Sequence, residues 1–108
     1  LQRKEVSAMN KVDLPETFYE LPKDRQSFLL SWISNNLRPI ESTNTRYTSY
    51  SIKHWIEEEY PNEYFTNGEL KGAMLEANYR TNNENALNWC FNISERSPII
   101  VKRKAQMK

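Results

Sequence analysis

The sequence predicts an α+β domain in which three helices are followed by a two-stranded β-hairpin. Apolar residues recur at helical spacing in three segments between residues 22 and 78, and they alternate with polar residues over residues 87–93. A run of β-branched residues follows a short polar turn, which predicts the returning strand of the hairpin. A chain of 108 residues is long enough for one hydrophobic core and too short for two.

The composition is compatible with one folded domain. Aromatic residues make up 12% of the chain, and their large rings compensate for a hydrophobic content of only 38%. The formal net charge is +1 at pH 7, so the total charge does not by itself indicate a nucleic-acid partner. Any nucleic-acid surface must therefore come from the distribution of the charges.

Residues 1–20 are predicted to form an irregular arm before a domain over residues 21–102, which ends in a basic tail over residues 103–108. Met9 would serve as a natural start, so we expect residues 1–8 to be upstream or added sequence. The rings of Phe18 and Tyr19 need burial, which predicts that the arm docks on the core as a strap.

The first helix is predicted over residues 22–37. Pro22 suits the first turn of a helix, where its missing N–H would have no partner, and Pro39 drives the residue before it out of the helical region. The buried stripe is predicted to contain Phe28, Leu29, Trp32, Ile33 and Leu37. The polar residues 41–46 that follow are predicted to form a loop.

The second and third helices each begin at a predicted cap. Thr48 or Ser49 caps the second helix, which ends before Pro61. Thr66 and Glu69 have the spacing of a capping box, in which each side chain bonds the backbone N–H of the other residue. The buried stripes are predicted to contain Ile52, Trp55, Ile56 and Tyr60 in the second helix, and Leu70, Ala73, Met74 and Ala77 in the third.

The hairpin is predicted after the third helix, which is expected to close at Asn78 in the left-handed region. Beyond the polar residues 81–85 the apolar period changes to two. The face predicted to pack on the helices contains Leu87, Trp89, Phe91 and Ile93. Residues 94–97 are predicted to form the turn, and residues 98–102 the second strand, with Pro98 at its first position.

This order of elements predicts a winged helix-turn-helix, and another small α+β domain with the same order remains an alternative. The third helix of such domains usually enters the major groove of DNA. Asn67 and Tyr79 are therefore predicted to approach bases, and the neighbouring cations to contact phosphates. The full predicted site comprises Asn67, Lys71, Tyr79, Arg80, Arg96, Lys102, Arg103 and Lys104.

Each of these groups is also compatible with a role that involves no nucleic acid. Glu69 and Glu76 cancel the charges of Lys71 and Arg80, so this part of the third helix is equally compatible with a solvated face. The basic tail is equally compatible with a solubilising end. Tyrosines that flank the helices are compatible either with stacking on unpaired bases or with the margins of the core. These tyrosines are Tyr47, Tyr50, Tyr64 and Tyr79.

Catalysis is not predicted. His54 is the only histidine, and Cys90 has no second histidine or paired acid to activate it. The two glycines, Gly68 and Gly72, do not form a phosphate-binding loop, and no cysteine or histidine cluster predicts a metal or a cofactor. The lone cysteine, the lack of a bilayer-length apolar run and the lack of a signal-peptide pattern predict a cytoplasmic protein.

Three stretches carry a resemblance to a known group of proteins. They are TSYSIKHWIEE (residues 48–58), YFTNGELKGAMLEA (residues 64–77) and NWCF (residues 88–91). The chain resembles small winged-helix proteins of phages and staphylococcal-type mobile genetic elements over residues 25–101, with Asn78 where glycine is expected. The matching positions are Ser49, Tyr50, Lys53, His54, Asn67, Gly68, Lys71, Ala73 and Met74. The resemblance implies an accessory role in replication beside a primase-polymerase and a helicase.

The sequence thus leads us to expect a non-enzymatic accessory protein that binds single- or double-stranded DNA. The alternative is a protein-interaction subunit or inhibitor that binds a replication polymerase, primase or helicase, or a host protein. The acidic residues 57–59 and the near-neutral net charge favour this alternative. A third possibility, a sequence-specific transcriptional regulator, requires dimerisation, for which the sequence offers no obvious helix.

Overall fold

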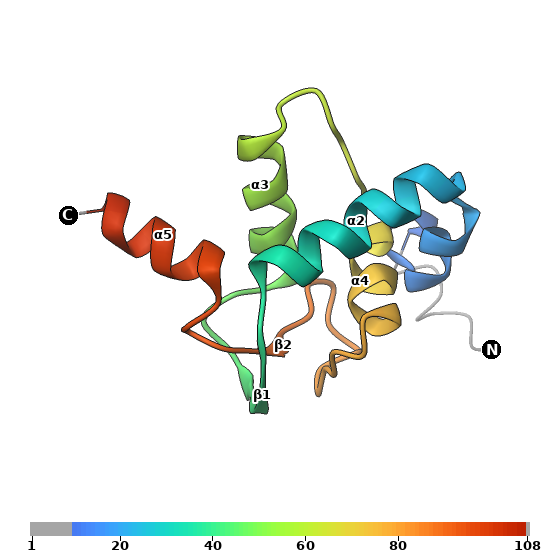
Figure 1. Cartoon of the computed structure of the whole chain (residues 1–108). Helices are drawn as coiled ribbons and strands as arrows, with labels where there is room; N and C mark the ends of the chain where they lie inside the picture. The colour runs from blue at the N-terminus through green and yellow to red at the C-terminus, as the bar shows by residue number, and fades with distance from the viewer. Residues whose placement is uncertain (1–9, 108) are drawn as a thin grey trace.

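The computed structural model describes residues 10–107, so the prediction for residues 1–8 lies outside the described residues. The elements are η1 (Lys11–Asp13), η2 (Pro15–Glu20), α2 (Lys23–Asn36), β1 (Pro39–Asn44), α3 (Ser49–Glu59), α4 (Asn67–Glu76), β2 (Phe91–Ile93) and α5 (Pro98–Gln106) (Figure 1). Within this range β1 and β2 form a two-stranded antiparallel sheet, and the predicted α+β class is confirmed. None of the helices in this range has the length and apolarity needed to cross a membrane.

The three predicted helices are confirmed as α2, α3 and α4. The Thr48 side chain accepts a hydrogen bond from the backbone N–H of Ser51, which begins α3. At the start of α4, Thr66 and Glu69 form the predicted capping box, with bonds of 2.9 and 3.1 Å. Asn78 has a φ angle of 71°, so the chain leaves α4 through the left-handed region as predicted.

The predicted hairpin is wrong. Residues 98–102 form the first turns of α5 instead of a strand, and β2 pairs with β1, in the segment that was predicted to be a loop. Pro98 suits the first turn of a helix as well as the first position of a strand. The backbone N–H groups of Ile100 and Val101 both bond to the carbonyl of Ser97, which begins the helix. Buried Ile99 and Ile100 fix α5 on the body of the domain.

The strand β1 is polar and mostly exposed, so its own sequence does not reveal it. Two asparagine side chains tie it to β2: Asn44 donates to the Ile93 carbonyl at 3.0 Å, and Asn92 donates to the Ile40 carbonyl at 2.8 Å. An isolated bridge joins Thr81 to Phe91 on the other side of β2. The chain from Thr81 to Phe91 therefore leaves and rejoins the sheet as a loop over residues 82–90.

The basic tail predicted over residues 103–108 is not a separate segment, because α5 continues to Gln106. Arg103 forms an ion pair with Glu58 of α3, and Lys104 forms one with Glu95, which follows β2. The second half of α5 therefore lies beside α3 and the turn after β2.

The core lies between α2, α3, α4 and β2. The predicted stripes supply most of it, and Trp89, Phe91 and Ile93 are buried as predicted. Leu87 and Tyr60 are exceptions to the predicted burial, since Leu87 is 52% exposed on the loop over residues 82–90 and Tyr60 is 40% exposed after α3. Phe18 of η2 is fully buried, which confirms that the arm docks on the core, whereas Tyr19 is exposed and bonds the Glu76 carboxylate.

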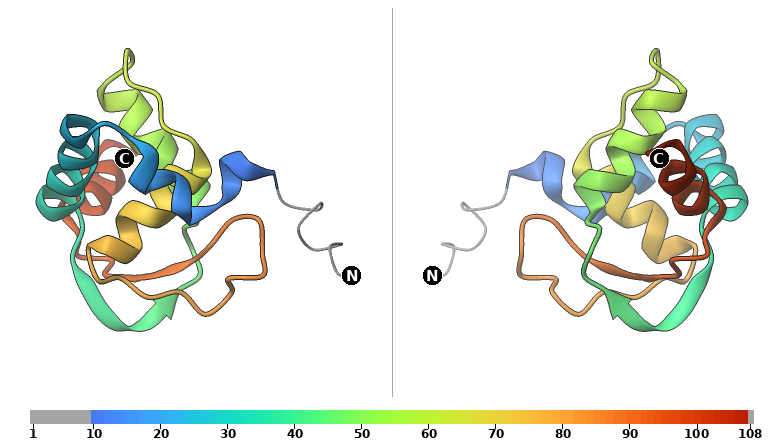
Figure 2. Two further views of the ribbon diagram at one scale, coloured as in Figure 1. Left: turned by 90° about the vertical axis from the view of Figure 1, so that its right-hand side faces the viewer. Right: turned by 90° about the vertical axis from the view of Figure 1, so that its left-hand side faces the viewer.

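The arm formed by η1 and η2 packs along α4 (Figure 2). Gly68 and Gly72, the two glycines of the chain, lie one helical turn apart at this contact. A Cβ atom on Gly68 would come within 3.0 Å of the Leu14 backbone, and one on Gly72 would meet the Pro15 carbonyl and the Phe18 side chain equally closely. The arm can therefore lie this close to α4 only where α4 has no side chain.

This contact predicts the effect of adding one methyl group. Gly72→Ala is expected to lower the free energy of unfolding by about 1–3 kcal/mol through overpacking, although alanine favours a helix by about 1 kcal/mol. Urea denaturation followed by tryptophan fluorescence measures the change. Ser31→Ala, at an exposed position of α2, is the control and should stay within about 0.5 kcal/mol of the parent protein. A Gly72→Ala protein that is more stable than the parent would contradict the close packing of the arm.

Candidate nucleic-acid interface

The face of α4 predicted to read DNA is covered. Lys71 has no exposed surface, and its Nζ atom donates to the Asp13 carbonyl at 3.0 Å and lies 4.8 Å from the centre of the Trp89 ring. Burial lowers the pKa of Lys71 below its ordinary value, and the charge of Asp13 opposes that shift. The prediction that Lys71 contacts phosphate is therefore wrong for this structure, in which Lys71 joins the arm to α4.

Asn67 is also buried, at the first position of α4. Its Nδ2 atom donates to the Leu87 carbonyl at 3.0 Å and to Oδ1 of Asn88 at 3.1 Å. Its Oδ1 atom is buried without a hydrogen-bond partner among the described residues. The amide of Asn67 thus holds the loop over residues 82–90 against α4 and does not face solvent, as contact with a base would require.

Arg38 lies between α2 and β1, and Arg96 lies between β2 and α5. The backbone carbonyl of Arg38 accepts from the Ser94 N–H at 2.7 Å, and its N–H donates to the Ser97 hydroxyl at 2.8 Å. These bonds place Arg38 beside the turn that carries the exposed Arg96. The Nη1 atom of Arg38 donates to the carbonyls of Ser34 and Leu37, so its guanidinium caps the end of α2.

A third arginine is tied to the same sheet. The backbone N–H of Arg80 donates to Oδ1 of Asn92 at 2.6 Å, and its Nη2 atom donates to the Glu41 carbonyl at 2.8 Å. Arg80 therefore reaches from one side of β2 to β1, and it is exposed. Arg38, Arg80 and Arg96, together called the arginine surface below, form no ion pair within residues 10–107.

The cations of α5 are mostly neutralised. Lys102 is exposed and forms no ion pair with a described residue, whereas Arg103 pairs with Glu58 and lies over the Trp55 ring. Glu95 pairs with Lys104, whose hydrogen bond is the main cause that lowers the pKa of Glu95. Of the predicted cations, Arg80, Arg96 and Lys102 are therefore open to a phosphate, while Arg103 and Lys104 are engaged.

The sequence prediction missed Arg38. The only signal for it was a cation between the predicted end of the first helix and Pro39. Its proximity to Arg96 depends on contacts between residues 59 positions apart. Local sequence signals do not predict contacts between residues so far apart.

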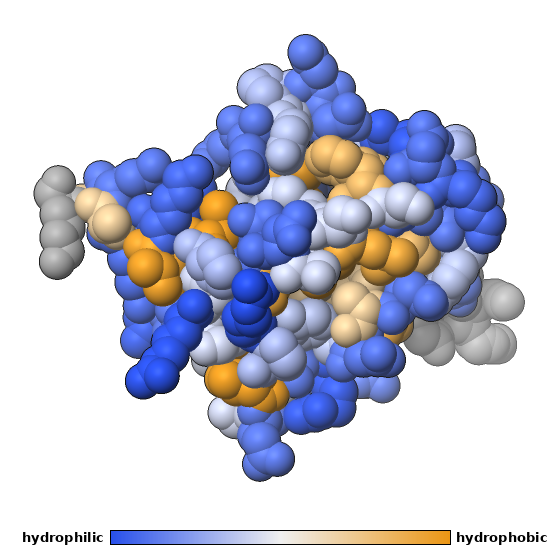
Figure 3. Space-filling model, in the orientation of Figure 1, coloured by the Kyte–Doolittle hydropathy of each residue, from blue (hydrophilic) through white to orange (hydrophobic). Residues whose placement is uncertain are grey.

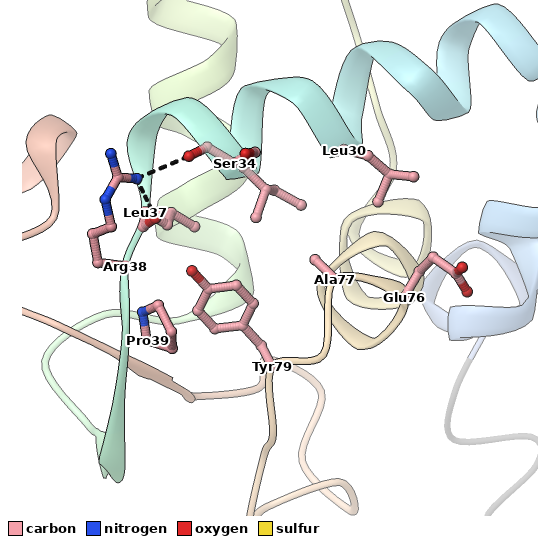
Figure 4. Close-up of a pocket in the computed structure, with 9 residues that line it drawn as sticks. Leu30, Ser34, Leu37, Arg38, Pro39, Glu76, Ala77 and Tyr79 are labelled. Atoms are coloured by element: carbon pink, nitrogen blue, oxygen red, sulfur yellow. Dashed lines mark hydrogen bonds between the residues drawn. The ribbon is translucent and has the colours of Figure 1, made fainter.

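A pocket of about 520 Å³ opens beside Arg38, between the C-terminal halves of α2 and α4 (Figure 4). Leu30, Ile33 and Ala77 give it an apolar wall, and apolar atoms reach the surface between these helices (Figure 3). Tyr79 is nearly buried in the pocket and is not placed to approach a base on an open surface. Burial raises its pKa, and the charge of Arg38 opposes that shift. The pocket can accept an apolar or planar group next to the Arg38 guanidinium.

Of the four tyrosines that flank the helices, Tyr50 and Tyr64 are exposed. Tyr47 is half-buried with its ring edge against Trp55, and Tyr79 is buried. Two of the four rings are therefore available for stacking, and both lie away from the arginine surface, at the N-terminal ends of α3 and α4.

The residues considered for catalysis are held in structural contacts. His54 lies against the Tyr50 ring, and its Nδ1 atom is 3.4 Å from the Glu57 carboxylate. Cys90 is buried. Within the part of the chain that the structure describes, no group of histidine, cysteine and acidic side chains is placed to hold a metal ion.

In comparisons with known proteins, no family model, no curated protein and no solved structure matches this chain. The resemblance to winged-helix proteins of phages and mobile elements stays a prediction from the sequence.

The burial of Lys71 predicts a pH dependence of stability. Because its pKa is lower in the folded protein, the unfolded chain binds the extra proton between this lowered pKa and the ordinary value of 10.5, so stability rises with pH across that window. Lys71→Met keeps the length of the side chain and removes the titration. Denaturation at about pH 7 and about pH 10 should show the parent gaining stability relative to Lys71→Met at the higher pH. A difference that does not change with pH would contradict the charged burial of Lys71.

Proposed function

We propose that this chain is a winged-helix domain that binds DNA without catalysis, through the arginine surface and not through α4. The order α2, β1, α3, α4, β2 supports the winged-helix assignment, because in that layout a strand lies between the first two helices. The bridge between Thr81 and Phe91 supplies a further short strand. The wing is then the loop over residues 82–90, and α5 is an addition after the last strand.

The observation that carries the DNA-binding proposal is the placement of the arginine surface. Arg38, Arg80 and Arg96 come from three separate segments. Arg38 and Arg80 are bonded through their backbones to residues in or directly after β2, and the Arg96 N–H donates to the Ser94 hydroxyl in the turn that follows β2. None of them is neutralised by a described carboxylate, although the net charge of the whole chain is only +1. Guanidinium groups suit phosphate because their planar donors match its oxygens.

The covered face of α4 changes the expected mode of binding. Direct reading of bases needs side chains that enter a groove, and Asn67 and Lys71 are held in the protein interior. Contacts to the phosphate backbone position a protein without reading sequence. The proposed binding is therefore strongly dependent on salt and weakly dependent on sequence. The proposal of an accessory role in replication of a phage or mobile element rests on the sequence resemblance.

The arginine surface predicts a matched pair of charge reversals. Arg96→Glu should weaken DNA binding and reduce the log–log salt slope by about one unit, since one phosphate contact is lost. Lys23→Glu makes the same charge change at the exposed first residue of α2, at the other end of the helix from Arg38, and should have little effect. Fluorescence anisotropy with duplex and single-stranded DNA at several salt concentrations measures both variants.

Equal losses in the Arg96→Glu and Lys23→Glu variants would mean that only total charge matters, which would contradict a localised surface. If the protein binds neither duplex nor single-stranded DNA at low salt, the proposed function is rejected as a whole.

A further inference from the structure

A second cleft lies at the N-terminal end of α4 and shares no residue with the arginine surface. It has a volume of about 310 Å³ and is bounded by η1, the first turn of α3, the linker before α4 and the loop over residues 82–90. In Figure 2, η1 and that loop lie on the same side of α4. The volume is at the lower end of the range for pockets that bind small ligands or single side-chain groups.

Exposed apolar side chains gather around this cleft. Val12, Tyr50, Tyr64 and Leu87 are each between 51% and 63% exposed, and all four line it. They come from four separate segments of the chain, so their meeting is a product of the fold. Tyrosines and other apolar groups concentrated in a recess are typical of the centre of a protein-binding surface.

The charges of the cleft favour a cationic occupant. The Nζ atom of Lys53 is 2.8 Å from the Glu57 carboxylate and 4.7 Å from the centre of the Tyr64 ring. Lys53 is therefore neutralised, and its position shows that a cation is stable against this ring. Asp13 also lines the cleft, and its carboxylate forms no ion pair with a described residue. Asp13 is thus the lining carboxylate without an ion pair among the described residues, although Lys71 lies on its buried side with its Nζ atom on the Asp13 carbonyl. On the open side of the arm this carboxylate opposes a phosphate and attracts a guanidinium or ammonium group.

We infer that this cleft binds a segment of a partner protein in which an apolar side chain is flanked by arginine or lysine. The apolar side chain lies between Tyr50, Tyr64 and Leu87, and the cation faces Asp13. The site is independent of the proposed DNA-binding surface, so the two can be tested separately.

The test uses the whole protein with isotope-labelled backbone and side-chain amides, followed by NMR. The probes are a capped tripeptide of leucine between two arginines, the same tripeptide with glutamates in place of the arginines, and single-stranded oligothymidylate. The basic tripeptide is expected to shift the signals of Lys53, Asn67 and Asn88 in a saturable way, and the acidic one is not. Tyr64→Ala and Asp13→Asn should each weaken binding on the order of ten-fold.

Tyr19→Ala is the control, because Tyr19 is an exposed tyrosine outside the cleft, and it should leave the affinity for the basic tripeptide unchanged. The inference is overturned if the basic tripeptide causes no shift, or if Tyr64→Ala binds it as tightly as the parent. It is also overturned if oligothymidylate, and not the basic tripeptide, shifts the cleft signals, because the tyrosines would then serve nucleic acid. Arg96→Glu should not change the result, which separates this test from that of the DNA-binding surface.

Discussion

The close approach of the arm to α4 is the contact on which the rest of the structure depends. It is possible because Gly68 and Gly72 leave a groove along one side of α4 into which the backbone of residues 14–18 fits. Phe18 then completes the core, and Lys71 bonds the Asp13 carbonyl beneath the arm. This one contact thus completes the core, covers the face of α4 that carries Lys71, and forms one wall of the cleft lined by Tyr50 and Tyr64, called the tyrosine cleft below.

The net charge of the chain conceals how its charges are arranged. Several described carboxylates pair with cations: Glu95 pairs with both Arg46 and Lys104, and Glu58 pairs with Arg103. Exposed pairs of this kind contribute little stability each, but they remove cations from the set that can meet an anion. Arg38, Arg80 and Arg96 are among the described cations that this pairing leaves without a carboxylate partner. A near-neutral chain can therefore present one basic region without being basic overall.

The helices could be predicted from the sequence because their signals are local. The caps at Thr48 and Thr66 and the left-handed residue Asn78 lie within a few residues of the helix ends that they define, and the structure confirms them. The strand β1 could not be predicted, since its partners Asn92 and Ile93 lie about fifty residues away and its own residues are polar. Pro98 is compatible with the start of either element, and only the pairing of β2 with β1 decides between them.

The candidate site was harder to predict than the fold for the same reason. Asn67 and Lys71 have the spacing of a helix face that reads DNA, and neither residue by itself indicates that the face is covered. The hydrogen bond from Lys71 Nζ to the Asp13 carbonyl of the covering arm joins residues that are 58 positions apart. The one signal in the sequence was that both glycines lie four residues apart in a helix, which permits a backbone to approach. The glycines therefore indicate that a backbone segment packs against α4, although they do not identify which segment it is.

If the chain is a winged helix as proposed, its covered third helix lacks the usual means of reading bases, and the remaining contacts limit its role. Phosphate contacts supply affinity and salt dependence but no preference for a sequence. Selectivity must then come from a second contact, and linking two weak contacts raises the effective concentration of each for the other. The tyrosine cleft and the arginine surface use different residues, so occupation of one leaves the other open. If both bind as proposed, the domain acts as a connector: the cleft selects the protein, and the arginine surface holds that protein on nucleic acid.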